Sequence, residues 1–460
     1  MVAQFAARIA LTGSSYQWAS RLANPKVGWG FGWLTFCWLG IGVVAADNAL
    51  ASQAFMPLFG IHADEGTASL ITLGVLAIQA VLAIASVRIV ALLNSSAVVV
   101  ELALIVGLAI ALIVVALITG HGSTDNLTSR GVAEHVPDYF GLGGGLMLAT
   151  IMGLCTLVGF DAAANLAEEA KDPFRSVPRA IIGSVVAAAI AGMVFLIALT
   201  VSIKDIKRVT LSDSAVAQIM RDQLGPVVEK TLLVAVTFSF FAAGMVTMAT
   251  GARLVYAMAR DGRFPFHPTF RRISPSTSTP IPATLLILAG GVALMLFIPG
   301  DALIQLITAA TILPVIIYGG TVILYLAVRK RLESQDGAFS LGRWDLTVAI
   351  LALVWLAITL FVLVAPHAAR VPVMIDLGLI AAGAIFFGLM LAFNRESLEV
   401  ELPADPAEVA VAAAEAALPS RSARECGAVR SSGSAEDRDR ETSVDECGFG
   451  FVHEDFEGVR

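Results

Sequence analysis

The chain has 460 residues, of which 57% are hydrophobic, and its mean hydropathy is +0.81. A soluble domain is far more polar, so this composition excludes one and indicates a polytopic membrane protein. The net charge of −7 comes from the end of the chain, because residues 395–460 hold 16 acidic and 7 basic residues. The acidity therefore belongs to a tail and not to a binding surface.

Apolar segments long enough to cross a bilayer follow one another along most of the chain. Residues 1–11 are apolar but too short to cross a hydrocarbon core of about 30 Å, and residues 12–27 have the composition of a loop. Ten spans are then predicted, at 28–56, 67–87, 89–119, 141–167, 177–201, 231–259, 280–298, 302–328, 344–365 and 371–394. The predicted fold class is an all-α polytopic membrane protein with ten complete transmembrane helices.

Lys and Arg are unevenly distributed over the predicted loops. If residues 12–28 are cytoplasmic, the inside loops hold 14 basic residues and the outside loops hold 7, of which 5 lie in one long loop. Basic residues are enriched on the cytoplasmic side of membrane proteins. We therefore expect a multi-pass protein of the cell membrane with both termini in the cytoplasm.

The chain divides into three parts by composition. Residues 1–27 precede the first complete span, residues 28–394 form the transmembrane body, and residues 395–460 are predicted to be a disordered acidic tail. The long outside loop at 204–230 is amphipathic. It is expected to hold a short helix on the outer surface, which acts either as a lid or as a simple connector.

The span at 141–167 has an unusual length and an unusual charge. As a straight helix its 27 residues extend about 40 Å at roughly 1.5 Å per residue, which exceeds the hydrocarbon thickness. Either the helix is tilted, or it is broken near Gly159. A break is favoured, because glycine permits it and the intramembrane acid Asp161 must face a cavity or a partner. Broken helices form midplane binding sites in secondary transporters.

Other polar residues in the predicted spans have competing interpretations. Asp161 can cap the second half-helix or carry a proton. Glu101 can serve as a proton site or pair with a donor on a neighbouring helix. Asp47 and Asn48 are interpreted as vestibule or packing residues rather than ligands.

Two further groups of residues are given structural roles. The hydroxyls of Ser239, Thr247 and Thr250 are expected to bond back to their own helix. Cys37 and Cys155 are expected to act as small apolar packing residues, since the four cysteines show neither a disulfide pattern nor metal-ligand spacing. The sequence contains no P-loop, nucleophile elbow or nucleic-acid patch, so neither an enzyme nor an ATP-driven pump is expected, and no cofactor or metal.

Several motifs resemble those of one transporter superfamily. The run GFDAAANLAEEAKDPFRSVPRAIIGS at 159–184 is similar to the end of the sixth span in the amino acid–polyamine–organocation (APC) superfamily of permeases. ARLVYAMARDGRFP at 252–265 is similar to the end of the eighth span, and STSTPIPA at 276–283 to the entry of the ninth. Residues 14–33 are similar to the loop after the second span, most closely in the amino acid/choline branch, whose members carry GABA and related amines.

The resemblance implies a fold like that of the leucine transporter (LeuT), with two inverted repeats of five spans and two extra spans. Residues 1–11 would then be the cytoplasmic end of span two, so span one and most of span two are absent from the sequence. A start further upstream is preferred to a degenerate gene. Span one of the family supplies half of the binding site.

The resemblance also assigns residues to roles. Val158, Gly159, Phe160 and Asp161 would bind substrate, because freed carbonyls suit an ammonium group and Phe160 can stack on a cation. In the alternative interpretation Gly159 is a packing residue and Phe160 faces lipid. Glu101 stands where many relatives have a lysine that replaces a sodium ion, so a lysine-type coupling mechanism is not expected here, and both a proton site and a structural pairing stay open for this carboxylate.

The expected function is secondary import of an amino acid or a related amine such as GABA, coupled to a proton. The alternatives are an exchanger that needs no ion and a non-transporting membrane protein, since the first span is missing. Glu168 and Glu169 are expected to be interfacial anchors rather than substrate ligands. The expected partners are the small-molecule substrate, the proton and the lipid bilayer, with no nucleic acid.

Overall fold

The computed structural model describes residues 1–9, 13–62, 64–120, 122–130, 139–141, 144–165, 167, 170, 172–212, 214–297, 302–330 and 339–399. All of them belong to one unit, Met1–Pro406. Most of the predicted tail at 395–460 lies outside the described residues, as do Glu168 and Glu169.

The described residues form helices and no strands, which confirms an all-α fold. The long helices are α3 (Pro25–Ala49), α5 (Glu65–Ala85), α6 (Val87–Thr119), α9 (Pro173–Val201), α12 (Pro226–Arg260), α14 (Ile281–Phe297), α15 (Ala302–Val328), α16 (Asp345–Val364) and α17 (Arg370–Phe393). The shorter ones are α1 (Val2–Ala6), α2 (Ser14–Leu22), α4 (Met56–Phe59), α7 (Gly145–Cys155), α8 (Ala162–Asn165), α10 (Ile206–Thr210), α11 (Ala215–Leu224) and α13 (His267–Phe270).

Eight of the described helical segments are long and apolar enough to cross a membrane, and α7 and α14 are shorter apolar helices. Nine of the ten predicted spans coincide with one of these segments to within five residues at each end. The predicted span at 141–167 is not one continuous helix, since α7 ends at Cys155 and α8 begins at Ala162. The break favoured by the sequence is therefore present.

Local sequence signals fix several helix ends. Asn24 accepts a hydrogen bond from the Val27 amide at 2.9 Å and is followed by Pro25 in the first turn of α3. The Asp64 carboxylate caps α5 by accepting from the Thr67 amide at 2.8 Å. Ser86 alone separates α5 from α6, with an extended backbone and a bond from the Arg88 amide. Short polar residues thus divide the apolar sequence into separate helices.

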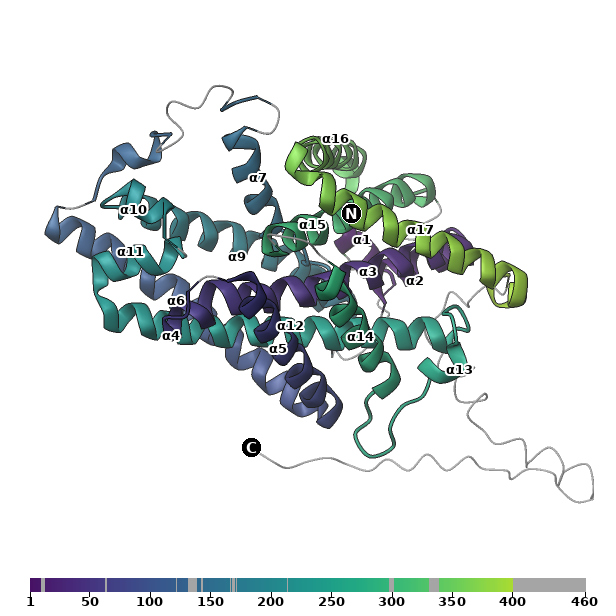
Figure 1. Ribbon diagram of the computed structural model, residues 1–460. Helices are drawn as coiled ribbons and strands as arrows, with labels where there is room; N and C mark the ends of the chain where they lie inside the picture. Colours follow the sequence, from purple (N-terminus) through teal and green to yellow (C-terminus); the bar gives the residue numbers. More distant parts are fainter. Residues whose placement is uncertain are drawn as a thin grey trace, which may run out of the picture. The chain divides into compact units, whose positions relative to one another are not determined.

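Helix α3 lies at the centre of the largest core. It packs against α12, α15, α2, α5 and α14, and Figure 1 shows α3 and α12 running side by side although they are distant in sequence. Its large apolar side chains belong to a cluster that includes Trp29, Trp33 and Ile41. At its end α3 continues into a π-helical segment, η1 (Leu50–Phe55), and then into α4.

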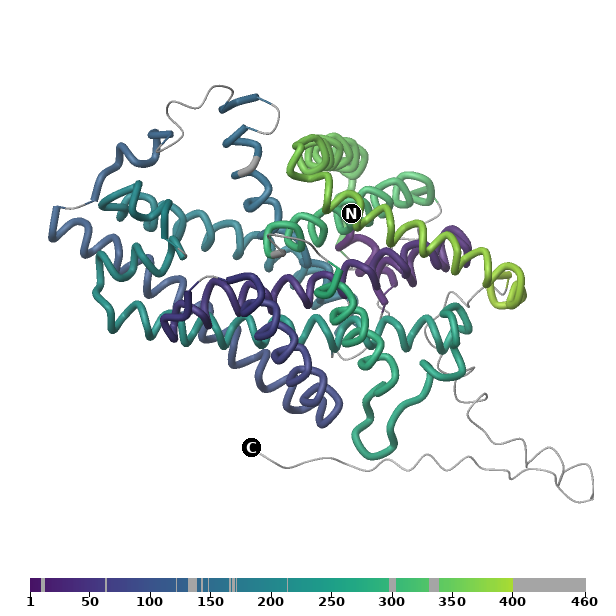
Figure 2. Tube along the Cα trace, viewed as in Figure 1, coloured from purple at the N-terminus to yellow at the C-terminus, as the bar shows by residue number. Residues whose placement is uncertain are grey.

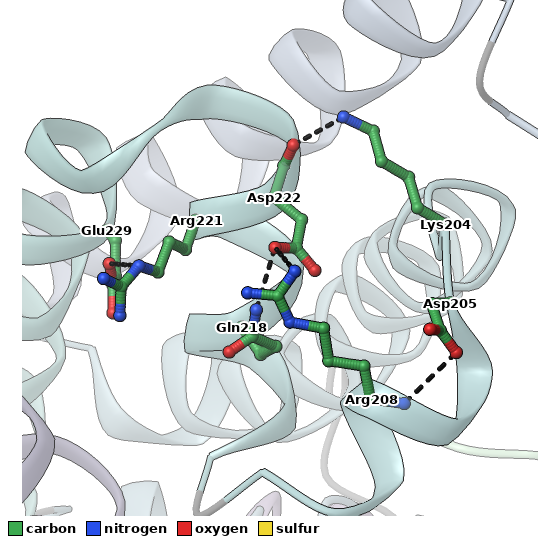
Figure 3. A network of polar contacts seen from close by, with 7 residues as sticks. All are labelled: Lys204, Asp205, Arg208, Gln218, Arg221, Asp222 and Glu229. Carbon is green, nitrogen blue, oxygen red and sulfur yellow. Dashed lines mark hydrogen bonds and ion pairs between the residues drawn. The ribbon is translucent and has the colours of Figure 1, made fainter.

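The helix expected in the loop at 204–230 is present as two short helices, α10 and α11. They pack on α6, α9 and α12 through an apolar cluster that includes Val209, Ile219 and Met220. In Figure 2 they lie at the left of the view, beside the first turns of α12. An ion pair joins the two helices, as Figure 3 shows: Arg208 of α10 lies 3.5 Å from the Asp222 carboxylate of α11, which also accepts from Gln218 of α11 at 2.8 Å. These contacts make the loop an ordered cap over three helix ends.

Candidate functional site

The centre of the candidate site is the interruption between α7 and α8. Residues 156–161 separate the two helices, and within them Gly159 has φ of +86°. That backbone conformation is accessible to glycine and strained for other residues. The sequence GFD at 159–161 therefore breaks the helix for a local reason.

Tyr318 on α15 holds this break in place. Its hydroxyl donates to Asp161 Oδ1 at 2.7 Å and accepts a hydrogen bond from the Gly159 amide at 3.0 Å. Asp161 is buried, with 2% of its surface exposed. The Asp161 side chain thus ties the break to a distant helix, which is a different contact from a cap on α8.

Aromatic rings line one side of the break. The rings of Phe160 and Tyr318 are stacked, with centroids 4.6 Å apart and planes at 28°. Trp38 of α3 lies edge-on to Tyr318, with centroids 6.4 Å apart. Three elements far apart in sequence therefore supply a continuous aromatic surface next to the interrupted backbone.

A cavity of about 310 Å³ lies between the break and α9. Leu157, Val158, Gly159 and Phe160 line it from the break, and Ser184 is among the residues that line it from α9. This volume is near the lower end of the roughly 300–1,000 Å³ range of small-ligand pockets. A second, largely apolar cavity of about 450 Å³ also reaches Val158 and Phe160.

The interruption leaves backbone acceptors unused. The carbonyl oxygens of Leu157, Val158 and Phe160 accept no hydrogen bond from any residue that the structure describes. Leu157 is exposed and Val158 and Phe160 are half-buried, and all three residues line the cavity, so their free carbonyls are available as hydrogen-bond acceptors for a ligand. An ammonium group, which has donors and no acceptor, fits such a surface.

The other predicted coupling residue is not part of this arrangement. Glu101 lies on an exposed face of α6, a helix that packs mainly against α5, α9, α11 and α12 rather than against α7 or α8. The structure therefore brings Val158, Gly159, Phe160 and Asp161 together and leaves Glu101 apart. Among the described residues, no cluster of His, Cys, Asp and Glu has the makings of a metal site.

The structure tests several of the smaller predictions. Thr247 and Thr250 donate to carbonyls one turn earlier in α12, at 2.8 and 2.9 Å, which confirms the predicted back-bonding for these two hydroxyls; for Ser239 it stays a prediction. Asp47 and Asn48 are both buried, so they are packing residues in this conformation and do not line an open vestibule. Cys37 is buried in the main core, as expected of a small apolar residue.

Sequence reasoning missed Tyr318 and Gln79, which are the partners of Asp161 and Asp47. Tyr318 donates to the Asp161 carboxylate, and the Gln79 amide donates to Asp47 Oδ1 at 2.6 Å. The available signal was a polar side chain in the middle of an apolar span, which inside a membrane has to find a partner. Nothing in the sequence indicated which acid each one would meet.

Comparison with known proteins gives a single family. The sequence pattern of the family described as amino acid permease matches residues 1–392. The low-affinity putrescine importer PlaP of Escherichia coli K12 is 28% identical over 309 residues, which cover 62% of this chain and 60% of the relative. A putative polyamine transporter of Candida albicans is 28% identical over 205 residues, covering 43% and 37% of the two chains.

A plant relative, the amino-acid permease BAT1 of Arabidopsis thaliana, is 26% identical over 267 residues, covering 54% of this chain and 50% of the relative. The chain thus spans between 37% and 60% of the length of these three relatives. Because the family pattern extends over nearly all of the helical body, the chain belongs to the amino acid permease family, within the amino acid–polyamine–organocation superfamily.

Proposed function

We propose that this protein carries out secondary transport of an amino acid or a related amine across the cell membrane, coupled to a proton. Family membership supports the substrate class, and the named relatives include a putrescine importer and an amino-acid permease. All of these substrates carry an ammonium group. GABA, which the resemblance to the amino acid/choline branch favours, belongs to the same class.

The observation that carries this proposal is the set of unpaired carbonyls at the helix break. Leu157, Val158 and Phe160 offer acceptors next to a cavity large enough for a small amine. The stacked rings of Phe160 and Tyr318 provide an aromatic face on which a cation is stabilised by about 0.5–2 kcal/mol. The substrate ammonium would lie between the carbonyls and this face.

In the proposed site the four residues at 158–161 have different tasks. Val158 and Phe160 contribute carbonyls and wall, while Gly159 allows the backbone to turn. Asp161 keeps the turn attached to α15 through Tyr318. Asp161 and Glu101 are the two coupling candidates, and the cytoplasmic placement of both termini is part of the same proposal.

Uptake by the purified chain in lipid vesicles tests the proposal. Labelled GABA, putrescine and neutral amino acids would be offered with and without an inside-alkaline pH gradient. We expect saturable uptake of at least one amine or amino acid, accelerated by the gradient. Absence of both uptake and substrate binding would contradict the proposal and leave a non-transporting membrane protein.

A matched pair of substitutions examines the aromatic wall. Phe160→Leu should raise the half-saturation concentration about tenfold, because each 1.4 kcal/mol of lost binding is roughly a factor of ten. Phe393→Leu, at an exposed position at the end of α17, is the control and should leave it unchanged. Equal behaviour of the two variants would argue against a site at the break.

Exchange without an ion is the second candidate, favoured by the position of Glu101 away from the break. Counterflow in the absence of a pH gradient measures exchange directly. Under this alternative the wild type shows counterflow but no acceleration by the gradient, and Glu101→Gln changes neither rate.

A further inference from the structure

A second polar cluster is buried where α3, α5 and α12 meet, apart from the helix break. Asp47 of α3 and Gln79 of α5 both have no exposed surface. The Gln79 amide nitrogen donates to Asp47 Oδ1 at 2.6 Å and to the Phe241 carbonyl of α12 at 3.0 Å. A single amide group therefore joins three helices around one carboxyl group.

Gly244 of α12 makes room for this arrangement. A Cβ at Gly244 would contact Asp47 Oδ1 and would lie 2.6 Å from Gln79 Nε2. No side chain larger than hydrogen fits without displacing one of the two polar groups. The close approach of α12 to the carboxyl–amide pair thus depends on glycine at this position.

The pair leaves one oxygen on each group without a partner. Asp47 Oδ2 and Gln79 Oε1 are both buried and accept no hydrogen bond from the residues described. An ionised carboxylate buried in this way is costly, and each unsatisfied buried acceptor adds to that cost. A proton on Asp47 removes the charge and turns the carboxyl group into a donor.

The protonated acid and the amide are complementary. The amide already donates to one carboxyl oxygen, and its own oxygen is the acceptor that the acid O–H requires. A carboxylic acid and a primary amide can therefore form a ring of two hydrogen bonds. Addition of one proton would satisfy both unpaired oxygens at once.

A metal cation fits the cluster poorly. Among the described residues the pair offers two unpaired side-chain oxygens, and the Gln79 NH₂ group donates one hydrogen bond to the carboxyl group and one to the Phe241 carbonyl. Hard cations in proteins take about six oxygen ligands. The donor set therefore favours a proton over a metal ion.

The elements packed around Asp47 bring it no charged partner. From α5 it faces Gln79, and from α12 it faces Phe241 and Gly244. Helix α14 and the π-helical segment η1 contain no ionisable side chain. In the part of the chain that the structure describes, no acid or base thus competes with Gln79 for the proton.

The π-helical segment begins three residues after Asp47. In η1, which starts at Leu50, the backbone has an extra residue per turn, and such segments occur frequently at functional sites. Asn48 is bonded to Thr72 of α5 at 3.3 Å, and its carbonyl accepts from Ser52 at 2.8 Å. Asp47 therefore lies next to a segment of irregular helical backbone.

We propose that Asp47 is a proton-binding site of this protein and that Gln79 is its positioning residue. The inference rests on the proposed transport function and specifies where its proton binds. Loss of the proton would break the acid–amide ring, leave a charge that needs water, and open the junction of α3, α5 and α12. The chemistry at the junction is thus separate from substrate binding at the break.

Transport in vesicles gives the first test. Asp47→Asn resembles the protonated acid in shape and charge, so it should keep counterflow of the transported amine and lose the acceleration by an inside-alkaline gradient. Asp64→Asn is the control, since Asp64 is an exposed helix cap whose carboxylate accepts from the Thr67 amide at 2.8 Å, and asparagine can keep that cap. Retained acceleration in Asp47→Asn would overturn the proposal.

Infrared difference spectroscopy gives a second test that needs no transport. The purified protein should show a protonated carboxyl band that titrates with pH and disappears in Asp47→Asn. Gln79→Leu should shift the pH midpoint of that band, and Gln79→Glu, which also lacks the amide, should not give the wild-type midpoint. If Asp47→Asn removes no titrating band, the proposal is overturned. If Asp47→Asn does not fold, Gln79→Leu tests the same band, and an unchanged pH midpoint in that variant overturns the proposal.

Wild-type behaviour separates this inference from the proposed function. If the wild type neither transports nor binds an amine, the transport function fails, while the infrared titration still reports on Asp47. If the wild type transports and the gradient has no effect, amine transport stands, while its coupling to a proton and the role of Asp47 in that coupling both fail. If the gradient accelerates the wild type and Asp47→Asn equally, the proposed function stands and the Asp47 inference fails.

Discussion

Two buried carboxyl groups in the helical body are held in different ways. Asp161 at the helix break and Asp47 at the junction of α3, α5 and α12 each accept one short bond from a neutral donor on another helix, at 2.7 and 2.6 Å. The Tyr318 hydroxyl also accepts from the Gly159 amide, so its hydrogen-bonding capacity is used. The Gln79 amide is left with an unpaired oxygen, as is Asp47 itself.

This difference indicates different roles for the two acids. At the helix break the donor hydroxyl of Tyr318 accepts from the Gly159 amide, two residues before Asp161, so this carboxyl group fixes the backbone of its own segment. A carboxyl group that faces an unpaired acceptor is complete only after it takes up a proton. The two acids are buried to a similar extent, so the number of unsatisfied atoms is the feature that distinguishes them.

The largest expected effect comes from removing the hydroxyl that holds the break. Tyr318→Phe keeps the ring stack with Phe160 but deletes the bonds to Asp161 and Gly159. Hydrogen bonds to charged or buried groups contribute about 1.5–3 kcal/mol each, so substrate affinity should fall by about 10- to 100-fold. The half-saturation constant for uptake in vesicles measures this.

Tyr325→Phe is the control for that substitution. Tyr325 lies two turns later in α15 and bonds Asp345 at 3.2 Å, away from the break. Its loss should leave the half-saturation constant within about twofold. If both variants lost affinity equally, loss of either tyrosine hydroxyl would act through a general disturbance of α15. The role assigned to the Tyr318–Asp161 bond, and with it the contrast between Asp161 and Asp47, would then be contradicted.

The sequence predicted the break because its causes are local. A glycine able to adopt positive φ, an acid two residues later and a span that is too long all lie within 141–167. Helix boundaries were predictable for the same reason, since Asn24, Asp64 and Ser86 cap the helices next to them. The family motif at 159–184 in addition indicated that this segment corresponds to the sixth span of the family.

The sequence did not predict the partners of the acids, because those contacts are distant. Tyr318 is 157 residues from Asp161, and Gln79 is 32 residues from Asp47. A single sequence gives the faces of individual helices but not the register in which two helices pack. For this reason the sequence indicated only a vestibule or packing role for Asp47. It could not predict that Asp47 and Gln79 would each keep an unpaired oxygen.

The close approach at the junction should show itself in stability. Gly244→Ala places a methyl group against Asp47 and Gln79, and overpacking of this kind costs about 1–3 kcal/mol. The thermal midpoint of the purified protein in detergent should fall accordingly. Gly74→Ala on α5, where a Cβ meets nothing within 4 Å, should leave the midpoint unchanged or raise it slightly. An unchanged midpoint for Gly244→Ala would show that the three helices are not tightly packed around the pair.

A third tyrosine–carboxylate bond, outside the membrane, extends the comparison. Tyr16 of α2 donates to Asp261 Oδ2 at 2.7 Å, and both residues lie in segments that are predicted to connect the spans. Burial raises the pKa of Tyr16 well above its usual value of about 10, and the Asp261 charge raises it further. At neutral pH, Tyr16→Phe should reduce the free energy of unfolding by about 1–2 kcal/mol.

The pH dependence of that substitution has a definite sign. In the unfolded chain Tyr16 ionises near pH 10, whereas in the folded protein it retains its proton, so the stability of the wild type falls as the pH rises above about 10. The Phe variant lacks this loss, so the difference between the two proteins should narrow in alkaline solution. Thermal midpoints from pH 7 to about 11 measure it, and a constant difference over that range would indicate that Tyr16 is not held in a protonated state.

The smallest effect is expected from the second bond at the junction. Asn48 donates to Thr72 at 3.3 Å, a long contact, and the Thr72 hydroxyl is already bonded to the Ala68 carbonyl at 2.7 Å in its own helix. Thr72→Val keeps the shape and removes one neutral acceptor, so the loss should stay below about 1 kcal/mol. Gradient-driven uptake should be unaffected, because Asp47 and Gln79 keep their own bond. If Thr72→Val instead abolished proton coupling as Asp47→Asn is expected to do, the coupling element would be the whole polar face between α3 and α5, and the single acid–amide pair would be too narrow a description of it.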